Sequence, residues 1–346
     1  MIFRQLFDQT SSTFTYLLAS RHGGEALIID PVFERVDRYV QLLKELDLKL
    51  IKVVDTHVHA DHITGMAELR NRTKCITVMG EHSPVDVVSM RVKEGEEIDI
   101  EGLALKAIYT PGHTSDSYSF LMDDRVFTGD TLLIRGTGRT DFQNGDPRAQ
   151  YDSLFNKLLK LPDDTLVYPA HDYKGDTVTT IEEEKAYNPR LQVKSVDEYV
   201  AIMNNLNLAN PKMMDVAVPA NMKVGVDQGV KLQARWARTA EQVLADCRTP
   251  ECVLVDLRED SEREKHGYIP SSIHAPYTRL DHFIKPGGML REMASATGKR
   301  LIYYCAYGER SALAVQTSQG MGLENVCHLV GGIDAWKKAG GPLNIS

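Results

Sequence analysis

The chain of 346 residues is 42% hydrophobic and 25% charged, which is typical of a soluble globular protein and is long enough for two domains of roughly 100 to 200 residues. A net charge of −8 gives no electrostatic reason to expect nucleic acid or a membrane surface as a partner, and no run approaches the roughly 18 apolar residues of a membrane span. Five unclustered cysteines argue against a disulfide framework and, with a start that lacks the pattern of a secretion signal, predict a cytoplasmic protein.

Residues 48–54 form a short apolar run rich in β-branched side chains, which predicts a buried strand. Three histidines and an aspartate follow it: His57, His59, Asp61 and His62. In an extended backbone the first three point to the same side, because side chains alternate with period two, while His62 begins a helical-looking stretch. This density of ligand side chains indicates a metal site with two adjacent coordination positions, whereas an isolated histidine is better explained as solvated or satisfied in the core.

Further candidate ligands lie beyond three later apolar runs. His113, Asp130 and His171 each follow such a run and a Pro or Gly, as expected where a strand ends in a loop that carries function. The pattern His-x-His-x-Asp-His, followed by Gly-His, Gly-Asp and a late His, resembles the metallo-β-lactamase superfamily. The resemblance implies an α/β fold, the αββα sandwich, with the metal at one edge.

Several other segments indicate which family within this superfamily the chain resembles. Residues 1–228 are similar to persulfide dioxygenases over almost their whole length. In that family one Fe(II) per chain is held by two His and one Asp, which the resemblance places at His57, His113 and Asp130. Such a set leaves about three positions open for water, dioxygen and a sulfur ligand. The segments that carry the similarity are residues 134–143, 169–173, 182–184, 188–190 and 218–222.

The remaining candidate ligands leave two alternatives open. In a persulfide dioxygenase, His59, Asp61, His62 and His171 would surround the iron ligands as hydrogen-bonding groups that orient them. In glyoxalase II, a related thioester hydrolase, Asp61, His62 and His171 would instead hold a second metal. All four residues are present, so the sequence does not exclude a dinuclear hydrolase.

Two residues near the candidate metal loops suit a substrate with carboxylates. The resemblance implies glutathione persulfide as substrate, and its carboxylates need cationic or hydrogen-bonding partners at the rim of the site. Arg139 and Tyr173, which flank two of the loops, are the candidates. A structural ion pair is the alternative role for Arg139. Beyond them, the apolar period predicts an amphipathic helix over residues 148–161, ending before Pro162.

The junction between the two predicted domains is less sharply marked. Residues 210–227 contain two prolines and no sustained period, which predicts a loop that closes a first domain, residues 1–228. A linker at residues 229–238 and a helix capped by Thr239 then lead into a second domain, residues 239–346.

The second domain is marked by one cysteine. An apolar strand runs into Cys305, a short loop and a helix, so loop N–H groups and a helix amino end face the sulfur and favour a thiolate. With the segments around residues 256–259, 267–275 and 329–336, the domain resembles a rhodanese, which implies an α/β fold with a central parallel sheet. Four residues separate Cys305 from Arg310, a loop length that suits a sulfane sulfur better than a phosphate. In a rhodanese, Cys305 would carry the sulfur as a persulfide that Arg310 stabilises.

Both halves concern sulfane sulfur, and the whole chain resembles bacterial persulfide dioxygenase-rhodanese fusions. The resemblance implies oxidation of glutathione persulfide by O2 to sulfite and glutathione, and exchange of sulfur between thiosulfate or sulfite and glutathione through Cys305. It leaves room for a homo-oligomer. The alternative is a glyoxalase II-like dinuclear thioester hydrolase with a regulatory or sulfur-carrier rhodanese domain.

Overall fold

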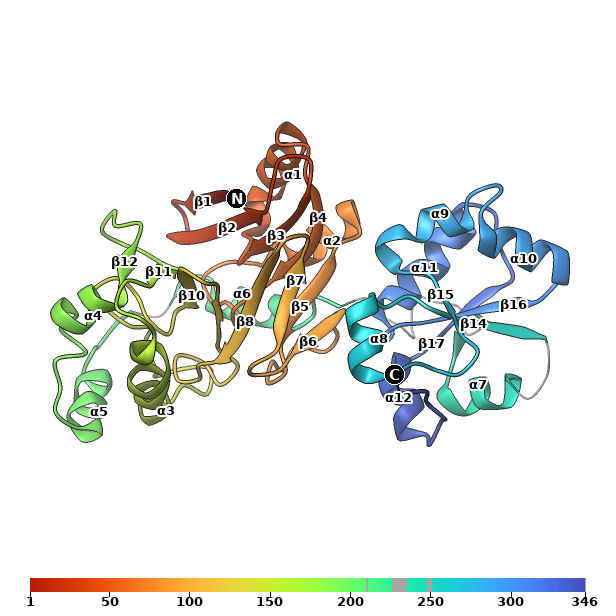
Figure 1. The fold of residues 1–346 in the computed structure, drawn as a ribbon. Helices are drawn as coiled ribbons and strands as arrows, with labels where there is room; N and C mark the ends of the chain where they lie inside the picture. Colours follow the sequence, from red (N-terminus) through yellow and green to blue (C-terminus); the bar gives the residue numbers. More distant parts are fainter. Residues whose placement is uncertain (210, 226–234, 248–250, 346) are drawn as a thin grey trace. The chain divides into compact units, whose positions relative to one another are not determined.

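A computed structural model describes residues 1–209, 211–225, 235–247 and 251–345. The chain divides into two compact units, each with its own sheets and its own apolar core (Figure 1). The first unit comprises Met1–Asp86 and Arg91–Val224, and the second comprises Val87–Met90 and Gly225–Ser346. The boundary predicted at residue 228 lies outside the described residues, as does most of the predicted linker, 229–238.

Two six-stranded sheets form the first unit. The fully buried strand Thr13–Ala19 and the aromatic side chains between the sheets show why they stack: the ring of Tyr16 lies 4.9 Å from that of Phe127 and 5.7 Å from that of Tyr168. In spatial order the first sheet contains β1 (Ile2–Asp8), β2 (Thr13–Ala19), β3 (Glu25–Ile29), β4 (Lys49–Val54), β5 (Ile76–Gly80) and β6 (Met90–Val92). The second contains β12 (Thr179–Thr180), β11 (Leu166–Pro169), β10 (Arg125–Gly129), β9 (Tyr118–Leu121), β8 (Leu103–Tyr109) and β7 (Glu97–Ile100).

Helices cover the outer faces of both sheets, so the first unit is the predicted αββα sandwich (Figure 1). One group packs on β10 and β11 through an apolar cluster that includes Leu154, Leu158 and Tyr199. On the first sheet lie η1 (Phe33–Arg35), α1 (Val36–Glu45) and α2 (Met66–Thr73). On the second lie α3 (Pro147–Asp152), η2 (Ser153–Lys157), η3 (Leu158–Lys160), α4 (Ile181–Tyr187) and α5 (Val196–Asn204), and α6 (Met214–Asn221) follows in the chain.

Three helical features of the first unit differ from the predictions. The helix predicted for residues 148–161 is broken into α3, a π-helical turn and a 3₁₀ turn, although its apolar face is buried as predicted. The helix after His62 begins only at Met66. Residues 210–227, predicted to be a loop, contain α6, whose Pro219 hides a helical pattern from sequence reading.

The second unit has one five-stranded parallel sheet with helices on both faces, as predicted. Successive residues of its central strand face opposite cores: Leu301 and Tyr303 enter one cluster, and Ile302 and Tyr304 the other. The strands, in spatial order, are β13 (Ala237–Arg238), β17 (Val326–Leu329), β16 (Arg300–Tyr304), β14 (Cys252–Asp256) and β15 (Ile273–His274). The helices are α7 (Ala240–Asp246), α8 (Asp260–His266), η4 (Tyr277–Arg279), α9 (Leu280–Ile284), α10 (Met289–Thr297), α11 (Glu309–Gly320) and α12 (Gly332–Lys338).

The start of the second unit is partly as predicted. Thr239 caps α7, and its side chain accepts a hydrogen bond from the backbone N–H of Gln242. Ala237 and Arg238, placed by the sequence at the end of the linker, instead pair with β17 and so belong to the sheet.

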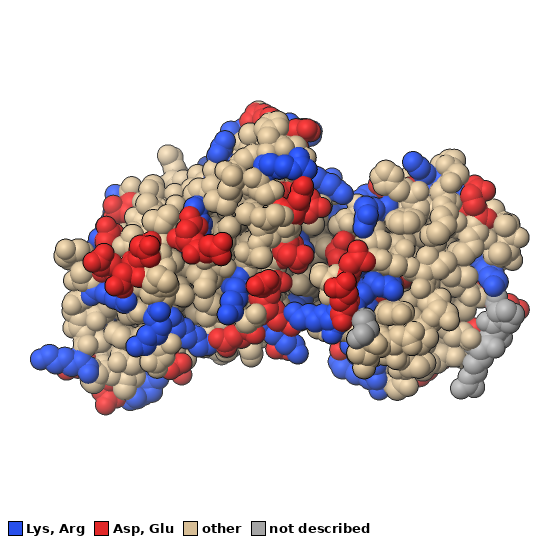
Figure 2. Space-filling model, viewed as in Figure 1, with Lys and Arg blue, Asp and Glu red and all other residues tan. Residues whose placement is uncertain are grey.

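Among the described helices, none combines the length and apolar character that a membrane span requires. On the face shown in Figure 2, Lys and Arg side chains are interspersed with Asp and Glu.

Candidate functional site

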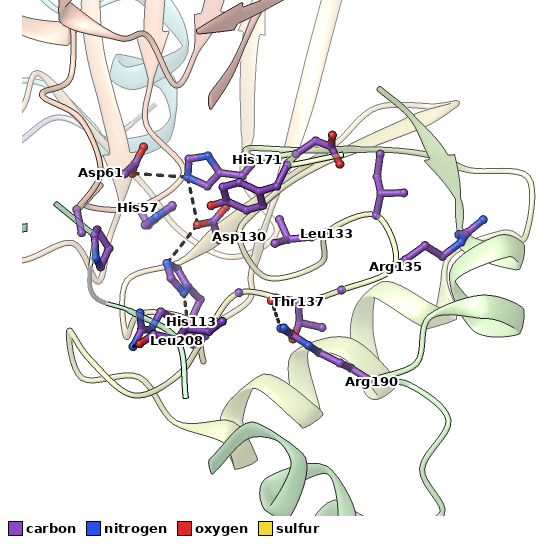
Figure 3. Close-up of a pocket in the computed structure, with 18 of the residues that line it drawn as sticks. His57, Asp61, His113, Asp130, Leu133, Arg135, Thr137, His171, Arg190 and Leu208 are labelled. Atoms are coloured by element: carbon purple, nitrogen blue, oxygen red, sulfur yellow. Dashed lines mark hydrogen bonds and ion pairs between the residues drawn. The ribbon is translucent and has the colours of Figure 1, made fainter. Parts of the chain in front are cut away.

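The candidate ligands of the first unit converge on one cavity of about 280 Å³ at the edge of the sandwich. Each arrives on a loop that follows a strand: His57 after β4, His113 after β8, Asp130 after β10 and His171 after β11. The pair β10–β11 is parallel, so Asp130 and His171 leave the sheet at the same edge. Figure 3 shows these side chains pointing toward one another in the cavity.

Three of these side chains lie close enough to share a metal ion. The ligand atoms of His57, His113 and Asp130 lie within 4.8 Å of one another, and His113 Nε2 is 3.4 Å from Asp130 Oδ2. All three side chains are buried. Two histidines and one carboxylate on one side of an open cavity form the donor set of non-haem Fe(II) oxygenases.

Hydrogen bonds behind the two histidines fix which ring nitrogen each one presents. His113 Nδ1 donates to the backbone carbonyl of Arg139 at 2.7 Å, which leaves Nε2 as the metal-binding atom. The hydroxyl of Thr56 donates to Asp30 Oδ2 and therefore accepts from His57 Nδ1, at 3.0 Å. Burial, with His59 and His113 nearby, holds the pKa of His57 well below its usual value, so the ring is neutral, as a metal ligand must be.

Buried polar atoms without a partner indicate that the site suits a cation. Among the described residues, Asp130 Oδ1, His59 Nδ1 and His62 Nε2 are buried and accept or donate no hydrogen bond. Leaving such atoms unsatisfied costs about 1–3 kcal/mol each, and a bound metal removes this cost where it reaches them. The donor set and the unpartnered Asp130 Oδ1 fit the predicted Fe(II), whereas His59 Nδ1 and His62 Nε2 belong to the neighbouring group of potential ligands.

The other histidines of the motif point in different directions. His171 Nε2 lies 3.5 Å from both Asp61 Oδ1 and Asp130 Oδ2 (Figure 3). His59 turns its Nε2 to Asp30, at 3.1 Å; burial lowers the pKa of His59, but the Asp30 carboxylate outweighs burial and raises it to about 9. The segment after β4 is not a strand, so alternation along a strand does not place these side chains, although His59 still brings a ligand atom within 4.8 Å of those of Asp61 and His62.

At the rim of the cavity, Arg139 and Tyr173 occupy different environments. The Arg139 guanidinium pairs with Asp141 at 2.5 Å and donates to the backbone carbonyls of Leu208 and Ala209, at 3.1 and 2.6 Å. These contacts favour the structural ion pair as its role. Tyr173 is exposed, lines the cavity and stacks its ring 5.9 Å from that of His171.

The sulfur of Cys305 lies in a tight loop at the carboxyl end of β16, the central strand of the second unit. The backbone N–H of Gly308 donates to Cys305 Sγ at 3.2 Å, and α11 begins at the next residue. Gly332, at φ +60°, lies so close that a Cβ there would stand 2.4 Å from the carbonyl oxygen of Cys305. The N–H of Gly308 therefore faces the sulfur, and the close approach of Gly332 fixes the backbone of Cys305 from the other side.

Arg310 makes a paired contact that the sequence did not suggest. Its two terminal nitrogens donate to the two carboxylate oxygens of Glu262 on α8, both at 2.6 Å, with Arg310 fully buried. Arg310 therefore joins α11 to α8 beneath the loop. Its Nε is buried with no hydrogen-bond partner.

Comparisons with known proteins find relatives of both units. Residues 239–339 match the rhodanese-like domain, and residues 9–85 and 79–171 match the metallo-beta-lactamase superfamily. The mitochondrial persulfide dioxygenase ETHE1 of Homo sapiens is 48% identical over 229 residues, which cover 65% of this chain and 89% of the human protein. The crystal structure of ETHE1 from Myxococcus xanthus, 55% identical, covers 64% of this chain and 98% of its own, with a TM-score of 0.63. The chain belongs to the persulfide dioxygenase family.

Hydrolases of the same superfamily are more distant from this persulfide dioxygenase family member. Hydroxyacylglutathione hydrolase from Rhodopseudomonas palustris (strain BisB18) is 32% identical over 244 residues, which cover 67% of this chain and 92% of the hydrolase. Identity to the human persulfide dioxygenase is thus higher, at 48% against 32% for this hydrolase.

The structure adds two residues of this persulfide dioxygenase unit to the candidate site that were not among the predicted site residues. Asn221 at the end of α6 donates to the backbone carbonyls of His59 and His62, both at 2.9 Å, and accepts from the N–H of Thr64. It holds the loop that carries the metal motif. Arg190 lines the cavity and donates to Thr137. Both lie in segments that carried the family resemblance, which was the signal available in the sequence.

Proposed function

We propose that the first unit oxidises glutathione persulfide with O2 and water to sulfite and glutathione, using one Fe(II) held by His57, His113 and Asp130. The observation that carries the proposal is the buried cluster of these three side chains, with its histidines oriented from behind, at the wall of an accessible cavity. Membership of the persulfide dioxygenase family supports the same conclusion.

When bound, the iron supplies a cationic position for the persulfide sulfur and a site for dioxygen. The residues of the chain orient the substrate. Leu133, Ile134 and Phe142 line the cavity with apolar side chains and exclude water from the sulfur. Arg190 and Lys174, which also line the cavity, offer positive charge to the carboxylates of glutathione.

Around the metal ligands, His59, Asp61, His62 and His171 are proposed to act through hydrogen bonds. Burial lowers the pKa of His171, but Asp130 and Asp61 outweigh it and raise that pKa well above its usual value. His171 thereby holds the two carboxylates at a fixed separation. Tyr173 beside it is placed to hydrogen-bond the substrate at the cavity mouth, and Arg139 to shape the opposite wall.

In the second unit, we propose that Cys305 accepts sulfane sulfur from thiosulfate, releasing sulfite, and passes it to glutathione as glutathione persulfide. The Cys305 thiolate attacks the outer sulfur of thiosulfate, the S–S bond breaks, and sulfite leaves with the bonding electrons. Glutathione thiolate then attacks the outer sulfur on Cys305, which regenerates the Cys305 thiolate. The N–H of Gly308, 3.2 Å from Sγ, supports this role because it stabilises the anionic sulfur.

Asp130→Ala tests the iron site. It should abolish iron binding and persulfide-dependent oxygen uptake together, because it removes one of three protein ligands, while thiosulfate–glutathione sulfur transfer continues in the second unit. Iron is counted per chain after anaerobic loading, and oxygen uptake is followed with glutathione persulfide. Asp163→Ala, at an exposed aspartate of the same unit, is the matched control. Iron retention with normal turnover in Asp130→Ala would remove the basis of the assignment.

One observation favours a second candidate, a dinuclear thioester hydrolase. His59, Asp61 and His62 also place one ligand atom each within 4.8 Å of one another. A hydrolase would bind two metal ions per chain and cleave glutathione thioesters without consuming oxygen. Counting metal in the wild-type protein and comparing thioester hydrolysis with oxygen uptake separates the two candidates.

A further inference from the structure

Beside the three candidate iron ligands, a threonine hydroxyl lies among the groups of the potential second metal position. Thr13 Oγ1 is 2.8 Å from Ser11 Oγ, 3.0 Å from Asp61 Oδ2 and 3.4 Å from the Nδ1 atoms of both His62 and His171. Thr13 is fully buried at the start of β2, where Phe14 N–H bonds to the carbonyl of Ala170 at 2.7 Å. The backbone therefore fixes where this hydroxyl lies.

The hydroxyl helps to satisfy Asp61, whose two oxygens both have partners. Oδ2 accepts from Thr13 and from His62 Nδ1, at 2.8 Å, and Oδ1 faces His171 Nε2 at 3.5 Å. A carboxylate only accepts, so the contact with Thr13 requires the threonine proton, which Thr13 shares between Asp61 Oδ2 and Ser11 Oγ. Asp61 therefore has a polar partner at both carboxylate oxygens without a second cation.

These donors differ in what they can do when a metal arrives. The rings of His62 and His171 carry nitrogen atoms that can bind a metal, whereas the neutral hydroxyl of Thr13 is a poor ligand. His62 Nε2 and His59 Nδ1 are buried without a partner, so most of a second site is already present. Within this cluster, the hydroxyl of Thr13 is the group that hinders the formation of a complete second metal site.

We propose that Thr13 is a positioning residue that keeps the centre mononuclear by holding Asp61 in a hydrogen-bonded arrangement. The inference rests on the proposed single-iron function and deepens it, because the same ligand motif serves one metal or two. A single iron held by three protein ligands would have coordination positions free for dioxygen and persulfide sulfur.

Thr13→Val tests this role, because valine keeps the β-branched shape and loses the hydroxyl. The full-length protein, freed of metal, is titrated with Zn(II) against a chelating dye, and metal per chain is also counted after gel filtration. We expect one ion in the wild type, and a second ion in Thr13→Val bound at least tenfold more tightly than any second ion in the wild type. Thr15→Val is the control: Thr15 lies two residues along the same strand, is buried, and donates to Asp30 O at 2.7 Å.

The outcomes separate the inference from the function on which it rests. One tightly bound ion in both wild type and Thr13→Val would overturn the role of Thr13 and leave the single-metal site intact. Two ions in the wild type would overturn the single-metal site itself. Should Thr13→Val fail to fold, Thr13→Ala provides a second variant without the hydroxyl, and Thr13→Ser, which retains it, must return the count to one.

Discussion

Arg139 supports the wall of the cavity through an ion pair and two backbone contacts. Its guanidinium joins Asp141 to the segment that contains Leu208, a residue that lines the cavity. Arg139 either supports that wall or binds glutathione directly. In both cases, removing its side chain weakens the binding of the substrate. Loss of one charge-assisted hydrogen bond costs about 1.5–3 kcal/mol.

Arg139→Ala should therefore raise the KM for glutathione persulfide by roughly ten- to a hundredfold with unchanged iron content. Asp141→Asn separates the two roles. If Arg139 supports the wall, this variant raises KM as well, but less, since Asp141 is half exposed. If Arg139 binds the substrate, freeing it from Asp141 lowers KM. An unaltered KM in Arg139→Ala would contradict both roles.

Cys305 is the residue on which sulfur transfer depends in the proposal. Cys305→Ser should abolish thiosulfate-to-glutathione transfer, because the serine hydroxyl is hardly ionised at neutral pH and cannot carry a sulfane sulfur. Oxidation of preformed glutathione persulfide should persist, whereas oxygen uptake driven by thiosulfate plus glutathione should disappear. Transfer at the wild-type rate would show that Cys305 is not the carrier.

Mass spectrometry gives an internal control for the same prediction. After thiosulfate treatment, the wild-type protein should carry one added sulfur on the Cys305 peptide and none on those of Cys75 or Cys327. Burial raises the pKa of Cys327 to about 12, so this thiol does not form a thiolate readily, and Cys75 serves as a second buried thiol for comparison.

At the scale of elements, one buried ion pair joins two helices beneath the cysteine loop. Glu262 on α8 and Arg310 on α11 form a two-bond contact, and Arg310 outweighs the effect of burial and lowers the pKa of Glu262. Breaking a buried pair by removing one partner typically costs about 3–5 kcal/mol. The pair therefore both positions the cysteine loop and stabilises the second unit.

Glu262→Gln should destabilise the second unit by about 3–5 kcal/mol and slow sulfur transfer, as measured by denaturant unfolding and by rhodanese assay. A carboxylate whose pKa is lowered by folding contributes stability above its unfolded pKa, about 4.3, and this stability is lost as pH falls through the folded value. The wild type should thus lose its advantage over Glu262→Gln in acid. A difference that did not change with pH would count against the ion pair as its source.

Local pattern was enough to predict the elements that carry the chemistry. The strands before His57 and Cys305 are apolar runs that end in loops, and Thr239 is a cap that can be read directly. The helix at α6 could not be read in this way. It contains Pro219 and is held by tertiary hydrogen bonds from Asn221, which lie beyond any local period.

The site was predictable as a set of residue types and not as a geometry. Spacing placed His57, His59 and Asp61 near one another, but the direction of His59 is decided by Asp30, which follows a different strand. Likewise, Glu262 and Arg310 meet only because β14 and β16 are neighbours in the sheet. Which side chains meet depends on the order of strands, and this order leaves no mark in the residues themselves.

At the scale of the whole molecule, the two units have separate cores and only the first holds the candidate iron ligands. A metal that binds the folded state adds stability of RT ln(1 + [L]/Kd), about 2.7 kcal/mol at a hundredfold excess over Kd. Calorimetry should therefore resolve two transitions, of which chelation lowers only one. Asp130→Ala should reproduce the lowered transition without a chelator, and a single transition that shifts as a whole would contradict this separation.

Thr13 contacts His171 across 158 residues of chain. During synthesis, this contact can form only after β11 and the loop beyond it have left the ribosome. Contacts of this length also slow folding, because the entropy of closing the chain is lost before any contact repays it. The three candidate iron ligands end at Asp130, so they are all synthesised before the residues that surround them are complete. Iron that binds only after His171 has joined this surround would report that the sheets of the first unit had come together.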